Sequence, residues 1–215
     1  MLDILFVSDY VCPYCLVAKE ALKQALEETG VEVNITWQPL ELTVEPAERV
    51  DTYSDERRRA GYQVLVEPCK SLGLDMKLPP KVIPRPYTRL AFEGWYFAQE
   101  KGLGEEYNEL MYRAYFIDEK DIGEMDVLVE LAESIGLDGA EYKAALENGT
   151  YSEVEKKAVA YSRNVLNPKG VPAIYINDKK VSVNDYTKEE MVQILLNENQ
   201  EDAGPGKSCS IFGCN

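Results

Sequence analysis

Histidine is absent from the 215 residues of this chain. Its absence excludes histidine-based catalytic triads, cysteine–histidine nucleophile pairs and metal sites that need an imidazole ligand. Proton transfer between side chains therefore falls to carboxylates, tyrosine, lysine or cysteine. Long apolar runs are missing too, since no stretch approaches the roughly 20 residues that a membrane-spanning helix needs.

Positive charge is scarce: 23 Lys and Arg stand against 38 Asp and Glu, which gives a net charge of -15 at pH 7. An acidic surface repels phosphate backbones and anionic lipids, so we expect neither nucleic acid nor a membrane as a partner. Residues 1–5 lack the basic region and the small-residue cleavage site of a secretory signal. The expected location is therefore the cytoplasm.

Cysteine is also rare, with five residues in the whole chain. So few do not form a disulfide scaffold, and in a reducing compartment clustered cysteines are more often catalytic or metal-binding than structural. Two of them form the motif Cys12-Pro13-Tyr14-Cys15. Cys69 stands alone, and we expect it to be an inert, partly buried thiol.

The C-x-x-C motif lies where a predicted strand passes into a predicted helix. Residues 4–7 form the apolar run of a buried strand, and residues 16–28 show helical periodicity. Two thiols at a helix start share one side of its first turn, where unpaired N–H groups and the helix dipole favour negative charge. Because the thiolate is the reactive form, the motif predicts a pair that closes into a disulfide and reopens.

Strand and helix patterns follow each other in a definite order. Gly30 is a natural end for the first helix, and the alternation over residues 31–40 predicts a second strand. Further helices are predicted over residues 54–68, 88–101, 105–115 and 124–135. Another helix is predicted to begin with a capping box at Ser152, and its apolar face would be formed by Val154, Ala158, Tyr161 and Val165.

The chain then returns to strand. Residues 171–176 and 180–183 predict two strands joined by a turn at Asn177-Asp178. A capping box at Thr187-Lys188-Glu189-Glu190 begins the last helix, which is expected to end near Leu196.

This order predicts an α/β protein with a thioredoxin-like fold, β-α-β…β-β-α, interrupted by a large all-helical insertion. Residues 1–41 and 168–196 would form the thioredoxin-like domain, and residues 42–167 the helical insertion domain. Residues 197–215 are expected to be a flexible C-terminal tail that contains a C-x4-C motif.

The sequence resembles the DsbA-like thioredoxin-fold oxidoreductases, and within them the cytoplasmic FrnE-type members. The specific motifs are the C-x-x-C pair in the segment from Ser8 to Cys15 and the Gly170-Val171-Pro172-Ala173 segment before the third strand. Weaker matches are Trp37-Gln38-Pro39-Leu40, Thr88-Arg89-Leu90-Ala91 and Ala114-Tyr115-Phe116. The Cys209-x4-Cys214 tail is similar to the extra C-terminal dithiol of some FrnE-type proteins.

The resemblance implies a role for each matching residue. Cys12 would be the exposed nucleophile, Cys15 the buried resolving thiol and Pro172 a cis-proline that faces the dithiol. The Val171 backbone would pair with an extended substrate, and Pro13 and Tyr14 would complete the substrate-binding site. The implied activity is that of a protein disulfide oxidoreductase or isomerase without a bound cofactor, with thioredoxin or glutathione as its electron partner.

The tail dithiol has two interpretations. Cys209 and Cys214 form an auxiliary redox pair that relays electrons to Cys12 or guards it, or the tail is inert. A zinc site of four thiolates, from Cys12, Cys15, Cys209 and Cys214, is chemically allowed. We expect no metal, because Pro13 and Pro172 crowd the first pair.

Two other function classes stay open. Kappa-class glutathione transferases and 2-hydroxychromene-2-carboxylate isomerases share the implied fold and insertion, but typically carry serine where Cys12 stands. A glutathione-dependent enzyme of that type is one alternative. A non-enzymatic holdase or metal–thiolate binder is the other. The helical insertion can also supply a dimer interface, and the sequence leaves the oligomeric state undecided.

Overall fold

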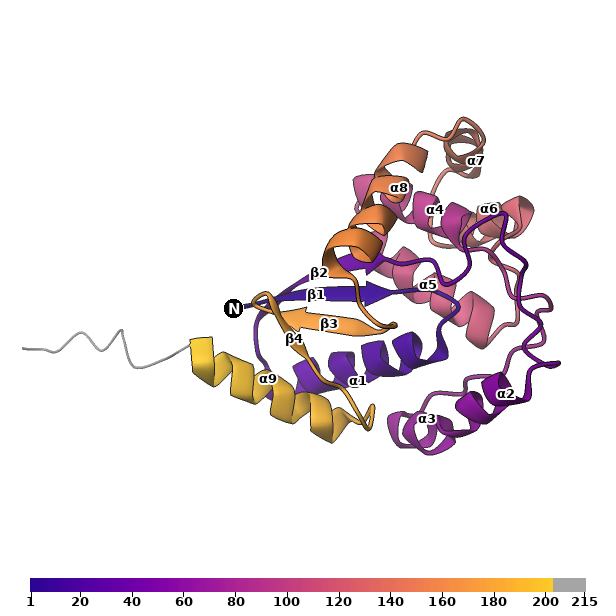
Figure 1. Cartoon of the computed structure of the whole chain (residues 1–215). Helices are drawn as coiled ribbons and strands as arrows, with labels where there is room; N and C mark the ends of the chain where they lie inside the picture. The colour runs from indigo at the N-terminus through magenta and orange to yellow at the C-terminus, as the bar shows by residue number, and fades with distance from the viewer. Residues whose placement is uncertain (203–215) are drawn as a thin grey trace, which may run out of the picture.

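The structure is a computed structural model that describes residues 1–202. A four-stranded mixed sheet lies at its centre in the order β2-β1-β3-β4 (Figure 1). Strand β1 (Leu2–Ser8) runs parallel to β2 (Val33–Pro39) and antiparallel to β3 (Ala173–Ile176), which pairs antiparallel with β4 (Lys179–Val181). This sheet confirms the predicted thioredoxin-like fold class.

Helices α1 (Pro13–Thr29) and α9 (Lys188–Asp202) lie side by side on one face of the sheet (Figure 1). Helix α8 (Ser152–Tyr161) contacts β2 on the opposite side. The central strand β1 is therefore buried on both faces near its end, which explains why its sequence is a continuous apolar run rather than an alternating one.

Helix α1 begins and ends where the sequence predicts. Pro13 occupies the first turn, where its missing N–H leaves no hydrogen bond unmade. Gly30 ends the helix in the left-handed conformation, with φ of 62°, and its N–H donates to the carbonyl of Leu26.

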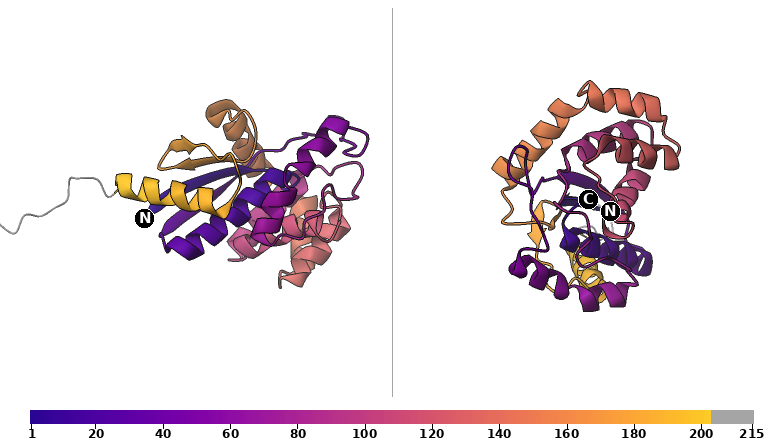
Figure 2. Two further views of the ribbon diagram at one scale, coloured as in Figure 1. Left: turned by 90° about the horizontal axis from the view of Figure 1, so that it is seen from below. Right: turned by 90° about the vertical axis from the view of Figure 1, so that its right-hand side faces the viewer.

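The insertion between β2 and β3 is helical, as expected, and wraps around one end and one side of the sheet (Figure 2). Its elements before α8 are α2 (Glu56–Gln63), α3 (Val66–Leu72), α4 (Arg89–Glu100), α5 (Gly104–Phe116), α6 (Met125–Ser134) and α7 (Gly139–Glu147), and a π-helical turn, η1 (Ser162–Leu166), follows α8. One continuous apolar core joins these helices to α1 and β1.

Two helix predictions in the insertion were wrong or incomplete. The single helix predicted over residues 54–68 is divided into α2 and α3. Pro68 lies in the first turn of α3, where proline is tolerated, and so does not end a helix there. Helix α7 was not predicted, although Asp138 caps it by accepting a hydrogen bond from the Glu141 N–H at 2.9 Å.

The predictions for α8 were also wrong in two respects. Tyr151, not Ser152, is the N-cap residue, and no side-chain capping bond forms. The predicted apolar face is largely exposed, since Val154 and Tyr161 face solvent, whereas Glu155 and Val159 are buried. Val165, which belongs to the same predicted face, is exposed too.

The C-terminal elements match the sequence more closely. Asn177 and Asp178 both have positive φ, as the predicted turn between β3 and β4 requires. The Glu190 N–H donates to the Thr187 hydroxyl at 3.2 Å, which confirms the capping box. However, α9 continues to Asp202, beyond the predicted end at Leu196, so the first part of the predicted tail is helical.

Within residues 1–202, no helix combines the length and the apolar character needed to cross a membrane.

A cluster of buried carboxyl groups explains the unexpected face of α8. Glu41, Glu93 and Glu155 are each at most 3% exposed and lie beside Arg89. Glu41 and Glu155 line one cleft of about 660 Å³ together with Arg89. Burial and the neighbouring carboxyls raise the pKa of Glu155 to about 8 and that of Glu41 to about 7.

These raised pKa values predict that stability falls as pH rises. The folded protein binds more protons than the unfolded chain between pH 4.5, the ordinary glutamate pKa, and about pH 8. We expect the free energy of unfolding to fall by on the order of 3–5 kcal/mol between pH 5.5 and pH 8 in urea titrations, since two groups titrate and one pKa unit corresponds to roughly 1.4 kcal/mol. Glu155→Gln should weaken this dependence of stability on pH, whereas the control Glu153→Gln, at an exposed neighbouring position, should leave it unchanged. The same dependence on pH in the wild type and in both variants would contradict the prediction.

Candidate active site

Cys12 is the N-cap residue of α1, at the end of a short loop that follows β1. Its backbone is extended, and its N–H donates to the Asp9 carbonyl at 3.0 Å. The Cys15 N–H donates back to the Cys12 carbonyl at 3.1 Å. The sulfur of Cys12 therefore lies at the helix end where unpaired N–H groups favour negative charge.

The Cys12 side chain packs against the segment that precedes β3. Its sulfur lies 3.4 Å from the Val171 carbonyl oxygen, to which the thiol donates. The Val171–Pro172 peptide bond is cis, as the resemblance implied. Residues 12 and 171, far apart in sequence, thus meet at the end of β1.

Cys12 is not exposed, contrary to the expectation for a nucleophile of this family. Only 4% of the residue is accessible. The reason is tertiary: Val171 lies on one side of the thiol, and residues of the insertion, including Leu42 and Tyr62, form the walls of the cleft that it lines. Access to the sulfur is through this cleft.

Cys15 is fully buried one turn further along α1. Burial raises its pKa well above the usual range, and the adjacent Cys12 side chain raises it further. Both thiols are unbridged, as is Cys69. Cys69 is buried in α3, and burial raises its pKa to about 11, in line with the inert thiol predicted.

Asp9 fixes the loop that carries Cys12, and the sequence alone did not single it out. Its carboxylate accepts hydrogen bonds from the N–H groups of Leu42, at 2.6 Å, and Val11, at 3.4 Å. It is completely buried, and this burial raises its pKa. Asp9 thus joins the Cys12 loop to the beginning of the insertion.

Tyr14 connects the motif to two other segments. Its hydroxyl donates to the Gly61 carbonyl of α2 at 2.9 Å, and its ring lies 5.3 Å from the ring of Tyr186, just before α9. Pro13 and Tyr14, the predicted substrate-binding pair, line the same cleft of about 200 Å³ as Cys12.

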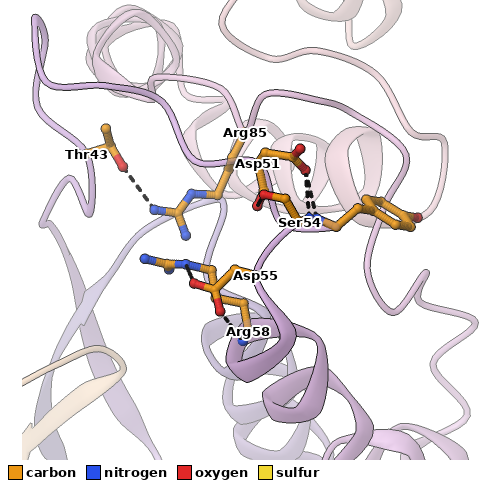
Figure 3. A network of polar contacts seen from close by, with 7 residues as sticks. Thr43, Asp51, Ser54, Asp55, Arg58 and Arg85 are labelled. Carbon is orange, nitrogen blue, oxygen red and sulfur yellow. Dashed lines mark hydrogen bonds and ion pairs between the residues drawn. The ribbon is translucent and has the colours of Figure 1, made fainter.

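The far wall of this cleft comes from the insertion. Thr52, Arg58 and Arg85 contribute polar groups there, and Figure 3 shows the two arginines with their hydrogen-bond partners. Sequence reasoning missed all three. They are scattered over residues 42–88, and no spacing rule connects them with the C-x-x-C motif; only the folding of the insertion brings them to it.

The remaining aromatic residues and cysteines do not enlarge the site within the described residues. Tyr10, Tyr115 and Phe116 are buried core residues. Residues 1–202 contain no cluster of three Cys, Asp or Glu side chains that could hold a metal ion. Cys209 and Cys214, and with them the auxiliary dithiol and the four-thiolate zinc alternative, lie outside the residues that the structure describes.

Comparison with known proteins agrees with this geometry. Residues 3–196 match the model of the DSBA-like thioredoxin domain. The chain belongs to this family. It is also 40% identical over 172 residues to the protein YwbO of Bacillus subtilis (strain 168), a match that covers 80% of this chain and 84% of YwbO.

Solved structures share the fold. A probable DsbA oxidoreductase from Streptomyces coelicolor superposes with a TM-score of 0.79 at 24% identity, covering 100% of this chain and 97% of that one. The cytosolic disulfide reductase DsbM from Pseudomonas aeruginosa gives 0.67 at 17% identity, covering 93% and 99%. A 2-hydroxychromene-2-carboxylate isomerase gives 0.69 at 17% identity, covering 94% and 99%. At these identities the similarity shows the fold alone. It does not indicate whether this chain catalyses a redox reaction or an isomerisation.

The Tyr14 hydrogen bond yields a direct test of how the insertion is held at the site. Tyr14→Phe removes the bond to Gly61 and leaves that carbonyl without its partner, so we expect a loss of about 0.5–1.5 kcal/mol in the free energy of unfolding by urea titration. Tyr161→Phe, at an exposed position on α8, is the matched control and should be neutral. Equal stability of the Tyr14→Phe variant and the wild type would show that this contact does not hold α2 at the site.

Proposed function

We propose that this protein is a thiol–disulfide oxidoreductase that exchanges disulfides with protein substrates through Cys12 and Cys15. One observation supports this most directly: a thiol at the N-terminus of α1 opens into a cleft, and a second thiol is buried one turn behind it. Serine at position 12 would favour a glutathione-dependent isomerase, but this chain has cysteine there.

The first step is the attack of the Cys12 thiolate on one sulfur of a substrate disulfide. The substrate S–S bond breaks, a mixed disulfide forms between Cys12 and the substrate, and the other substrate sulfur leaves as a thiolate. Cys12 is the N-cap residue of α1, and the positive end of a helix dipole is a place that favours negative charge.

Cys15 completes the exchange. Its sulfur attacks Cys12, the mixed disulfide breaks, and the substrate leaves fully reduced while Cys12 and Cys15 become disulfide-bonded. The departing substrate thiolate takes up the proton that Cys15 loses. Because burial keeps Cys15 protonated, the buried thiol does not compete with Cys12 for the incoming disulfide.

The Val171 backbone provides a place for the substrate chain. It lies directly beside the Cys12 sulfur, so an extended segment that pairs with it would hold its own disulfide at the reacting thiol. Such pairing is independent of side chains, which suits an enzyme that accepts many protein substrates.

The cycle closes when the Cys12–Cys15 disulfide is reduced. We propose either the dithiol of thioredoxin, which becomes a disulfide, or two molecules of glutathione, which leave as glutathione disulfide. The same steps in reverse oxidise a substrate dithiol. The direction depends on the reduction potentials of the enzyme and of its compartment. A cytoplasmic location and a FrnE-type subgroup stay predictions.

Substitution of the two cysteines separates their roles. Cys12→Ser should lower the rate of insulin disulfide reduction by on the order of 100-fold or more, because the nucleophile is lost. Cys15→Ser should also block turnover but trap mixed disulfides at Cys12, visible as adducts by mass spectrometry. Cys69→Ser, which removes a buried thiol outside the site, is the control and should retain activity.

Two outcomes would favour other functions. Full activity of Cys12→Ser would remove the proposed nucleophile. Turnover that requires added glutathione and survives Cys15→Ser would point instead to a glutathione-dependent enzyme with a single reactive sulfur.

A further inference from the structure

Arg85 lies in the wall of the Cys12 cleft without an acidic partner. The residue is 7% exposed, yet it forms no ion pair with any carboxylate among residues 1–202. Its Nη2 donates to the Thr43 hydroxyl at 2.9 Å, and its buried Nε has no hydrogen-bond partner among the described residues. Asp9 lies close enough to act on Arg85 electrostatically but forms no ion pair with it, so the buried guanidinium keeps an unsatisfied donor whose position requires an explanation.

The carboxylates near Arg85 are engaged elsewhere. Asp51 accepts hydrogen bonds from the N–H groups of Tyr53 and Ser54, and Asp55 caps α2 and pairs with Arg58. Asp9 exerts an electrostatic effect on Arg85, but its oxygens accept from Leu42 and Val11. Figure 3 shows that the guanidinium groups of Arg85 and Arg58 extend to the same side, while Asp51 faces the backbone at Ser54.

The charged side chains that line the cleft are both basic. Arg58 and Arg85 line it and no carboxylate does, although the chain has a net charge of -15 and Asp55 pairs with Arg58 from outside the lining. Thr52 adds a hydroxyl that is buried and has no hydrogen-bond partner within residues 1–202. Cys12 lines the same cleft.

We propose that Arg85, Thr52 and Arg58 form a subsite for a carboxylate that the disulfide substrate carries next to its reacting sulfur. This proposal rests on the proposed function and adds a preference among substrates. The guanidinium presents planar donors that match a carboxylate in geometry and charge. The Thr52 hydroxyl can donate a further hydrogen bond.

The size of the cleft determines what part of the substrate enters. Its volume of about 200 Å³ is below the roughly 300–1,000 Å³ of sites that enclose a whole small molecule. One acidic group therefore enters while the disulfide lies at Cys12. That group is either an Asp or Glu side chain beside a cystine in a polypeptide or a free carboxylate of a small cysteine-containing disulfide.

The test compares two short disulfide peptides that differ only in Glu or Gln next to the cystine. We expect reduced wild-type protein to react about 10-fold faster with the Glu peptide, since a charge-assisted hydrogen bond contributes about 1.5–3 kcal/mol and 1.4 kcal/mol is tenfold. The net negative charge of the protein would by itself favour the Gln peptide. A preference for Glu thus has the opposite sign to the general field.

Substitutions in the cleft test whether its residues cause the preference for the Glu peptide. The Glu-to-Gln rate ratio should fall below about 3-fold in Arg85→Gln and in the double variant Arg58→Gln/Thr52→Val, since a charge-assisted hydrogen bond is lost in each. The double variant leaves the buried Arg85 in place and keeps the test available if Arg85→Gln does not fold. Arg57→Gln, on the exposed side of α2, removes one positive charge outside the cleft and should keep the ratio.

The outcomes separate this proposal from the proposed function. If Cys12 reacts with the neutral bis(2-hydroxyethyl) disulfide but the wild type reacts equally fast with the Glu and Gln peptides, the subsite is overturned and the proposed function is not. No reaction with any disulfide would overturn the proposed function. A Glu-to-Gln rate ratio that stays at the wild-type value in both Arg85→Gln and Arg58→Gln/Thr52→Val would also overturn the subsite.

A second pair of probes identifies the source of the carboxylate. Oxidised glutathione carries free carboxylates that its ethyl ester replaces with neutral, slightly larger ester groups. A preference for the acid form that is lost in the Arg85→Gln variant would support a small-disulfide source. A preference for the acidic probe that is seen with the Glu and Gln peptides but not with the two forms of glutathione would support an acidic polypeptide as the substrate.

Discussion

The beginning of α1 at Cys12 is the constraint on which the rest of the site depends. A buried strand must end and a buried helix must begin within four residues, and Pro13 can occupy only the first turn of that helix. Asp9 fixes the loop from within by accepting two backbone hydrogen bonds. As a result Cys12 lies at the positive end of the helix dipole, and Cys15 is turned into the core.

The insertion is part of the active site rather than an appendage to it. It encloses Cys12 so that only 4% of the residue is accessible, and it attaches to α1 through the hydrogen bond from Tyr14 to Gly61. Its loops place Arg85 and Thr52 in the same cleft. The thioredoxin-like part thus supplies the two thiols, and the insertion supplies the walls of the cleft that Cys12 lines.

Family membership and chemistry rest on different observations. The DsbA-like fold is shared with a disulfide reductase and with an isomerase at similar TM-scores, so the overall fold leaves the reaction undecided. The features that support the proposed disulfide exchange are local: two thiols one turn apart, the Val171 carbonyl 3.4 Å from one of them, and a cleft that Cys12 lines.

The sequence by itself determined the strands, α1 and the place of both thiols at its beginning, because these depend on local periodicity, turn residues and a motif with fixed spacing. The cis bond before Pro172 came only from the family resemblance. Only the tertiary structure decided that Glu155 and not Val154 faces inward, that Cys12 is covered, and that Arg85 lies beside it. Buried polar groups follow from partners distant in sequence: Glu155 is buried because Glu41 meets it, and Arg85 lies in the Cys12 cleft because the insertion folds over the thiol.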